Sequence, residues 1–202
     1  MATYSRLQSN AYEKMAFNAG MVLIGSTAFT PDTGAVVEEK ILGASSGGWS
    51  FNAGINTSDL AEDVDNARPG MKQFLRFSHS EPHLTGTLLT FDSTSIKLIQ
   101  PGSTVTTSET THVVKATPNG YFTDSDFYDL WLITDYSTIT DVSGTATSGF
   151  FALKLKNCLN VSGAQLQTSE DGKMTMPVDF RAFYDANSAT EEPYEIYFKA
   201  NT

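Results

Sequence analysis

Three groups of side chains in this 202-residue chain have the chemistry of a metal or catalytic site. His79 and His83, with Glu81 between them, have the spacing of a zinc-binding pair on a helix. Pro82 disfavours a helix there, and on a strand residues four apart are too far from one another to share one metal. The pattern therefore predicts no zinc site.

The second group consists of carboxylates in the polar stretch 57–70. Asp59, Glu62, Asp63 and Asp65 have the oxygen ligands that calcium prefers, but they lack the regular spacing and the central glycine of a calcium-binding loop. We therefore expect a long, solvated acidic loop that faces a partner, and no bound metal.

The third group, Asp124, Asp126 and Asp129, lies among aromatic residues, and glycosidases use a pair of carboxylates. Nothing in the spacing separates an acid from a base. Residues 43–48 have the glycines of a phosphate-binding loop without its lysine and serine. The single cysteine, Cys158, excludes an intrachain disulfide and is expected to be a small buried apolar residue. The sequence thus predicts no catalytic residues and no cofactor, and it favours binding or assembly over enzymatic activity.

The composition indicates a globular, mainly β protein. Hydrophobic residues make up 40% of the chain and charged residues only 18%, with a net charge of −10. This acidic balance argues against a protein that binds nucleic acid through contacts to the phosphates. It is compatible with a surface past which nucleic acid moves without binding. The N-terminal residues do not form a signal peptide, and no apolar run is long enough to cross a membrane. We expect a chain made in a cytoplasm.

The elements that position these groups are best defined in the stretch 147–185. Alternation places Phe151, Leu153 and Leu155 on one face of a strand, with Lys154 and Lys156 on the other. A second strand alternates in the same way. Its two faces are Met174, Met176, Val178, Phe180, Ala182 and Tyr184, against Lys173, Thr175, Asp179 and Arg181. A three-residue loop at 170–172 sets Met176 opposite Leu166 and keeps the apolar residues on one face.

In all, the chain is predicted to form about ten short strands and one helix. The helix is expected to follow Asp92 or Ser93, to run through Ile96 and Ile99, and to end before Pro101. Residues 1–18 are polar and are predicted to form an N-terminal arm. Residues 19–202 are predicted to form one domain.

Taken in order, several stretches of the chain resemble the major tail proteins, or tail tube proteins, of long-tailed bacteriophages of Gram-positive hosts. The resemblance spans about residues 17–200. It is carried by FNAG at 17–20, GGWSFNA within 43–53, EDVDN at 62–66, residues 84–90, YDLW within 124–135, the hairpin described above, and PYEIYFK at 193–199.

The resemblance implies a β-sandwich subunit with one short flanking helix and a structural, non-enzymatic role in the virion. Six copies would form a ring in which their strands make a joint barrel, and rings would stack into a hollow tube. The implied partners are the tape-measure protein inside the tube, a tail terminator and tail-tip proteins. Genome DNA would pass through the lumen without specific binding, and no membrane would be involved. The chain would be made in the host cytoplasm and reside in the virion tail.

Two sets of residues are candidates for subunit contacts or for the lumen. One is the polar face of the 147–185 hairpin, and the other is the acidic loop. Together they are Lys154, Lys156, Asp179 and Arg181, and Asp59, Glu62, Asp63 and Asp65. Two alternatives remain open from sequence: a baseplate or host-surface carbohydrate-binding module that uses Trp49 or Trp131, and the tube of a phage-derived contractile injection device.

Overall fold

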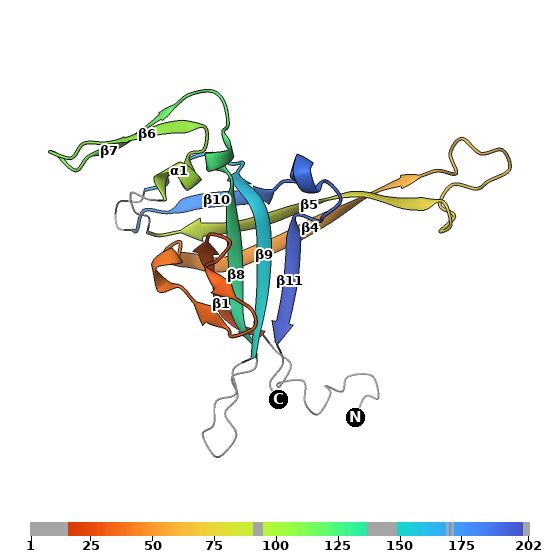
Figure 1. Cartoon of the computed structure of the whole chain (residues 1–202), viewed down its shortest axis with the longest axis horizontal. Coiled ribbons are helices and arrows are strands. Elements are labelled where there is room, and N and C mark those ends of the chain that lie inside the picture. The colour runs from red at the N-terminus through yellow and green to blue at the C-terminus, as the bar shows by residue number, and fades with distance from the viewer. Residues whose placement is uncertain (1–15, 91–94, 137–148, 169, 171, 200–202) are drawn as a thin grey trace, which may run out of the picture.

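The computed structural model describes residues 16–90, 95–136, 149–168, 170 and 172–199, and these residues are mainly β (Figure 1). The strands are β1 (Ala16–Ile24), β2 (Phe29–Thr30), β3 (Ala35–Val36), β4 (Ser45–Asp59), β5 (Leu75–Leu88), β6 (Ser103–Thr107), β7 (Val114–Pro118), β8 (Tyr128–Tyr136), β9 (Gly149–Asn160), β10 (Met176–Ala182) and β11 (Tyr194–Lys199). The helical segments are α1 (Ile96–Ile99) and the 3-10 turns η2 (Glu38–Lys40), η3 (Asp124–Asp126) and η4 (Ala186–Ser188). The predicted mainly-β fold with one short α-helix is confirmed.

Seven strands form one antiparallel sheet in the order β1-β8-β9-β10-β5-β4, with β11 paired to β9. Strand β9 pairs with β11 along residues 150–155 and with β10 along residues 158–160. Because its partner changes partway along, the sheet divides into two halves whose strands cross steeply (Figure 1). The halves form a sandwich that is not closed into a barrel, since no ladder joins β1 to β4 among the described residues.

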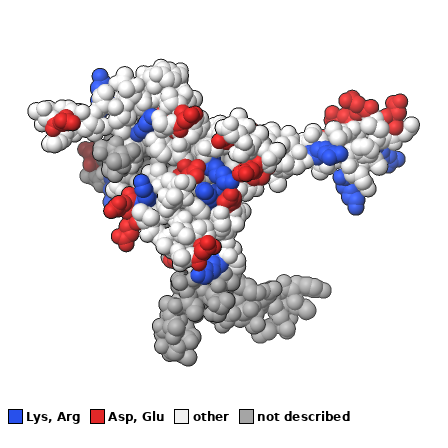
Figure 2. Space-filling view, in the orientation of Figure 1, with Lys and Arg blue, Asp and Glu red and all other residues white. Residues whose placement is uncertain are grey.

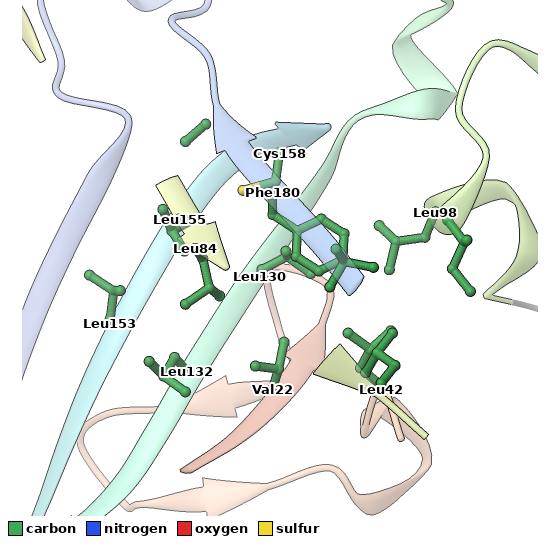
Figure 3. Packing of buried hydrophobic residues seen from close by; sticks show 14 of the residues in the cluster. Val22, Leu42, Leu84, Leu98, Leu130, Leu132, Leu153, Leu155, Cys158 and Phe180 are labelled. Carbon is green, nitrogen blue, oxygen red and sulfur yellow. The ribbon is translucent and has the colours of Figure 1, made fainter. Parts of the chain in front are cut away.

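The main core lies between these two halves. Figure 3 shows side chains from β1, β5, β8, β9 and β10 pointing toward one another around Phe180, which is fully buried. The buried members come from both halves of the sheet and from α1. They include Val22, Leu84, Leu88, Leu98, Leu130, Leu132, Leu153, Leu155, Met176 and Val178.

A second, smaller core covers the other face of β8 and β9. The short hairpin of β2 and β3 places Phe29 against Trp131 and Phe150, at ring-centroid distances of 5.3 and 5.0 Å. Leu23 and Ala152 are completely buried in the same cluster. The sheet is therefore covered on both faces at this end.

The hairpin predicted for 147–185 is present in part. Met176, Val178, Phe180 and Ala182 are buried on one face of β10, as predicted. The predicted register is found at the Gln167–Thr175 bridge. Beyond this bridge, β10 pairs with β5, and Val178 lies opposite Gly86.

Three glycines allow β4 to lie against the core. Gly47 and Gly48, in the glycine-rich stretch 43–48, have φ of +79° and +78° and form an irregularity within β4. This irregularity places the Trp49 side chain over Gly86. A Cβ added at Gly86 would lie 2.4 Å from the indole ring. Trp49 also stacks near Phe180, at a centroid distance of 6.4 Å. A side chain at position 86 would therefore displace Trp49 from the core.

Helix α1 is joined to the sheet through the buried carboxylate of Asp126. This side chain accepts hydrogen bonds from the Thr123 amide and hydroxyl and from the Gly102 amide, and it lies 3.3 Å from Lys97 Nζ. Burial alone would raise the pKa of the Asp126 carboxyl. The Thr123 hydrogen bonds and the Lys97 charge outweigh burial and lower the pKa below its ordinary 3.8. Asp126 is thus a structural residue that fixes η3, α1 and the start of β6.

The helices in the described part of the chain are too short, or too polar, to span a bilayer.

Candidate interaction surfaces

The most prominent surface feature is an arm made of the outer ends of β4 and β5 and the loop between them, residues 55–79. It projects far from the sandwich (Figure 1). The antiparallel register continues along the arm, pairing Thr57 with Phe77 and Asp59 with Leu75. Sequence analysis predicted a long acidic loop over 57–70, whereas β4 continues to Asp59 and the loop is the tip of a long hairpin.

The arm concentrates exposed apolar side chains. Of the seventeen large hydrophobic residues that are exposed among those described, six lie on the arm. They are Ile55 (66% exposed), Leu60 (50%), Val64 (44%), Met71 (42%), Leu75 (51%) and Phe77 (54%). Leu75 and Phe77 lie two residues apart on one strand and so share a face of the hairpin. Gathered exposed apolar side chains are typical of interaction sites on proteins.

The acidic residues predicted for this region occupy the tip of the arm. Asp59 has an internal role, because its carboxylate accepts hydrogen bonds from the amides of Ala61 (2.9 Å) and Gly70 (2.6 Å). The Gly70 bond, followed by the Ala61 bond, lowers the pKa of Asp59. Glu62, Asp63 and Asp65 are exposed.

The arm also carries three basic residues, Arg68, Lys72 and Arg76, all exposed. None of them forms an ion pair with another residue in the described part of the chain. Figure 2 shows acidic atoms gathered along one edge of the arm's end and basic atoms along the opposite edge. The two signs of charge are therefore separated across the tip.

The four charged residues predicted on the polar face of the hairpin each have partners within the chain. Lys154 Nζ lies 3.9 Å from Asp129 Oδ2 and 5.4 Å from the centre of the Trp131 ring. Lys156 Nζ lies 2.6 Å from Glu195 Oε1.

On the neighbouring strands, Asp179 Oδ1 lies 2.9 Å from His83 Nδ1. Arg181 Nη2 lies 3.3 Å from Glu81 Oε1, and its guanidinium packs over the Phe183 ring at 5.2 Å. All four predicted residues are partly buried.

Lys156 and Glu195 form the closest ion pair on this face, at 2.6 Å. The hydrogen bond to Glu195 raises the pKa of Lys156, against the opposing effect of burial. The same bond, followed by one from the Tyr197 hydroxyl, lowers the pKa of Glu195. Both groups are therefore charged at neutral pH, and the cation is neutralised within the subunit.

The base of the arm is anchored by a polar contact across the sandwich. The Tyr184 hydroxyl accepts a hydrogen bond from the Ser80 amide at 2.8 Å and donates to Glu192 Oε2 at 2.9 Å. Ser80 Oγ also donates to this carboxylate oxygen. These bonds tie β5, the segment after β10 and the segment before β11 together where the arm leaves the sheet.

The residues considered for metal binding and catalysis have separate partners. His79 lies near Glu81, with 3.5 Å between Nε2 and Oε1, while His83 pairs with Asp179. Among the described residues, no group of three histidine, cysteine, aspartate or glutamate side chains is placed to hold a metal.

The three aspartates near the aromatic cluster differ in environment. Asp126 is buried beneath Thr123, Asp129 accepts a hydrogen bond from the Asn157 amide at 3.1 Å, and Asp124 is exposed. Cys158 is buried as predicted, and its burial, followed by the charge of Asp129, raises the pKa of its thiol well above the ordinary value. Trp131 is only 2% exposed.

Comparison with known proteins gives little information on this architecture. No protein-family model matches the chain, and a search of curated proteins finds no significant match. Fourteen chains of solved structures match significantly. Among them is a chain of the virion of a native gene transfer agent (GTA) particle, which is 7% identical and has a TM-score of 0.39, over 90% of this chain and 96% of that chain. A TM-score this low carries no argument about function.

Proposed function

We propose that this protein is a structural virion subunit that assembles with copies of itself into a tail tube. The observation that carries the proposal is the arm, whose six exposed apolar side chains are unburied in the single chain. An isolated two-stranded hairpin is marginally stable in water, and it gains stability when its apolar face packs against another surface. An assembly of identical subunits provides such a surface on every neighbour.

The finer features of this proposal rest on the resemblance to tail tube proteins. Six copies would form each ring, with their sheets joined in a barrel around a lumen, and rings would stack. The tape-measure protein would occupy the lumen during assembly, and terminator and tip proteins would contact the two ends. A net charge of −10 per subunit supports passage of DNA without binding, because the tube as a whole would repel the phosphate backbone.

Deleting the arm tests the proposal. Residues 57–78 are replaced by Asn-Gly, so that a two-residue turn joins β4 to β5 at the Asn56–His79 pair. The sandwich core is retained, because no member of either hydrophobic cluster lies in the deleted segment. We expect wild-type protein to sediment as rings or tubes and the deletion variant to sediment as a folded monomer. Equal assembly of the two proteins would refute the role of the arm.

A further inference from the structure

The sandwich has an acidic groove beside the base of the arm. It consists of two hollows, of about 510 and 380 Å³, that adjoin because Tyr184 lines both. One hollow lies between η3 and η4, and the other lies against the arm at Phe77 and His79. We use the term acidic groove for this pair of hollows.

The lining of the acidic groove combines aromatic rings with carboxylates. Phe127 and Phe183 meet edge to face, with 5.8 Å between ring centroids. Asp124 and Asp185 line the same hollow, and Glu192 lines the other. None of the lining residues of either hollow is a lysine or an arginine. The groove therefore has the chemistry to receive basic side chains with long apolar stems.

Two of these carboxylates are already held in place. Asp185 accepts hydrogen bonds from the Asn187 amide and side chain, at 2.8 and 3.0 Å. Glu192 is held by Ser80 and Tyr184. Fixed acceptors lose less conformational entropy when a cation binds, which favours a defined contact.

The basic edge of the arm has the complementary chemistry. Arg68, Lys72 and Arg76 lie on an arm that also exposes apolar side chains, and they have no ion-pair partner among the described residues of their own chain. The arm extends away from η3 and η4, so its tip lies far from the groove of the same chain (Figure 1). The arm of a second copy of the chain can instead place its basic edge against this groove.

We propose that the acidic groove of one copy receives the basic edge of the arm of a second copy, with Arg68 and Lys72 opposite Asp124 and Asp185. This inference rests on the proposed function, because it names the surface that buries the arm. Another aromatic hollow, beside β11, is lined by Phe150, Tyr197 and Phe198 and by one residue of each charge, Asp32 and Lys199, so its charged lining residues offer the basic edge no net attraction. Charge therefore favours the acidic groove.

Charge reversal on each side tests the contact. Asp124→Lys changes the groove at an exposed position, and the double variant Arg68→Glu with Lys72→Glu changes the arm. Glu109→Lys and Lys115→Glu are matched controls, because they reverse exposed charges on the β6–β7 hairpin. We expect each groove or arm variant to raise the critical concentration for assembly about tenfold or more, and the controls to leave it within about twofold. Chemical denaturation checks that every variant is folded.

A triple variant with reversed charges on both sides of the contact provides the decisive measurement. The groove variant and the arm variant each lack one half of the contact, but a triple variant that carries all three reversals restores opposite charges across it. We expect this triple variant to assemble near the wild-type critical concentration. Two results would overturn this contact while the proposed function stands, provided that the wild-type chain assembles. One is that the groove variant and the arm variant assemble as well as the wild type. The other is that the triple variant assembles no better than they do. A wild-type chain that remains monomeric would overturn both.

Discussion

The double substitution Leu75→Thr with Phe77→Thr removes two apolar side chains from one face of the arm and keeps residues that favour a strand. Leu75 is 51% and Phe77 is 54% exposed in the single chain, so about half of each remains for a neighbour to bury. Complete burial of such a side chain contributes about 1.5–3 kcal/mol, so each contributes roughly 1 kcal/mol to a contact. A combined loss of about 2 kcal/mol corresponds to an increase of about 30-fold in the critical concentration.

Light scattering across a concentration series measures this change, and urea denaturation measures the fold. Because both side chains are half exposed and distant from the core, we expect the free energy of unfolding to change by less than about 0.5 kcal/mol. Leu166→Thr is the control, since Leu166 is 62% exposed but lies outside the arm. If the double variant assembled at the wild-type concentration, or if Leu166→Thr weakened assembly equally, the argument that the arm is buried by a neighbour would be refuted.

Two further predictions concern charged residues. We expect Asp126→Asn to lower the free energy of unfolding at pH 7 by about 2 kcal/mol, through loss of charged hydrogen bonds. The wild-type pKa is depressed, so this advantage is present above the ordinary value of 3.8 and is lost as the pH falls through the lower native pKa. Urea denaturation at pH 7 and at pH 3 measures the difference, and a deficit that did not depend on pH would contradict the assignment. We also expect the double variant Lys154→Glu with Asp179→Lys to disturb tube formation. Its free energy of unfolding should fall by only roughly 1 kcal/mol, because the ion pairs that Lys154 and Asp179 form within the chain are partly exposed. Normal tubes by electron microscopy would show that this face meets neither a neighbour nor the lumen.

Elements with a buried face could be predicted from the sequence. Leu153 and Leu155 alternate with Lys154 and Lys156, and the structure places the two leucines in the core and the two lysines outside it. The short helix through Ile96 and Ile99 is likewise present. In both cases, burial on one side produces the periodicity that sequence reasoning detects.

The arm could not be predicted in the same way. Ile55, Leu75 and Phe77 are apolar and yet exposed, so this segment lacks the contrast between an inner and an outer face that identifies a strand. Pro82 argued only against a helix at its position. It is accommodated in β5 directly beyond His83, the last residue there that pairs with β10. Sequence analysis therefore identified the acidic tip but not the length of the hairpin that carries it.

The candidate surfaces were also only partly accessible to sequence reasoning. Asp59, Glu62, Asp63 and Asp65 were identified as a group, but the basic residues beside them were not considered. The acidic groove combines residues near 124–127 with residues near 183–187, segments that the fold brings together around Phe127 and Phe183. No pattern within either segment signals the other, so this surface emerges from tertiary structure alone.

Electron microscopy of the purified full-length chain over a range of concentrations tests the central claim most directly. If the arm serves self-assembly, the images will contain hexameric rings or stacked tubes, and arm-deleted protein under the same conditions will contain neither. A wild-type chain that stays monomeric at every concentration, including in the presence of a tail-initiating complex, would contradict the assignment of this protein as a tube subunit.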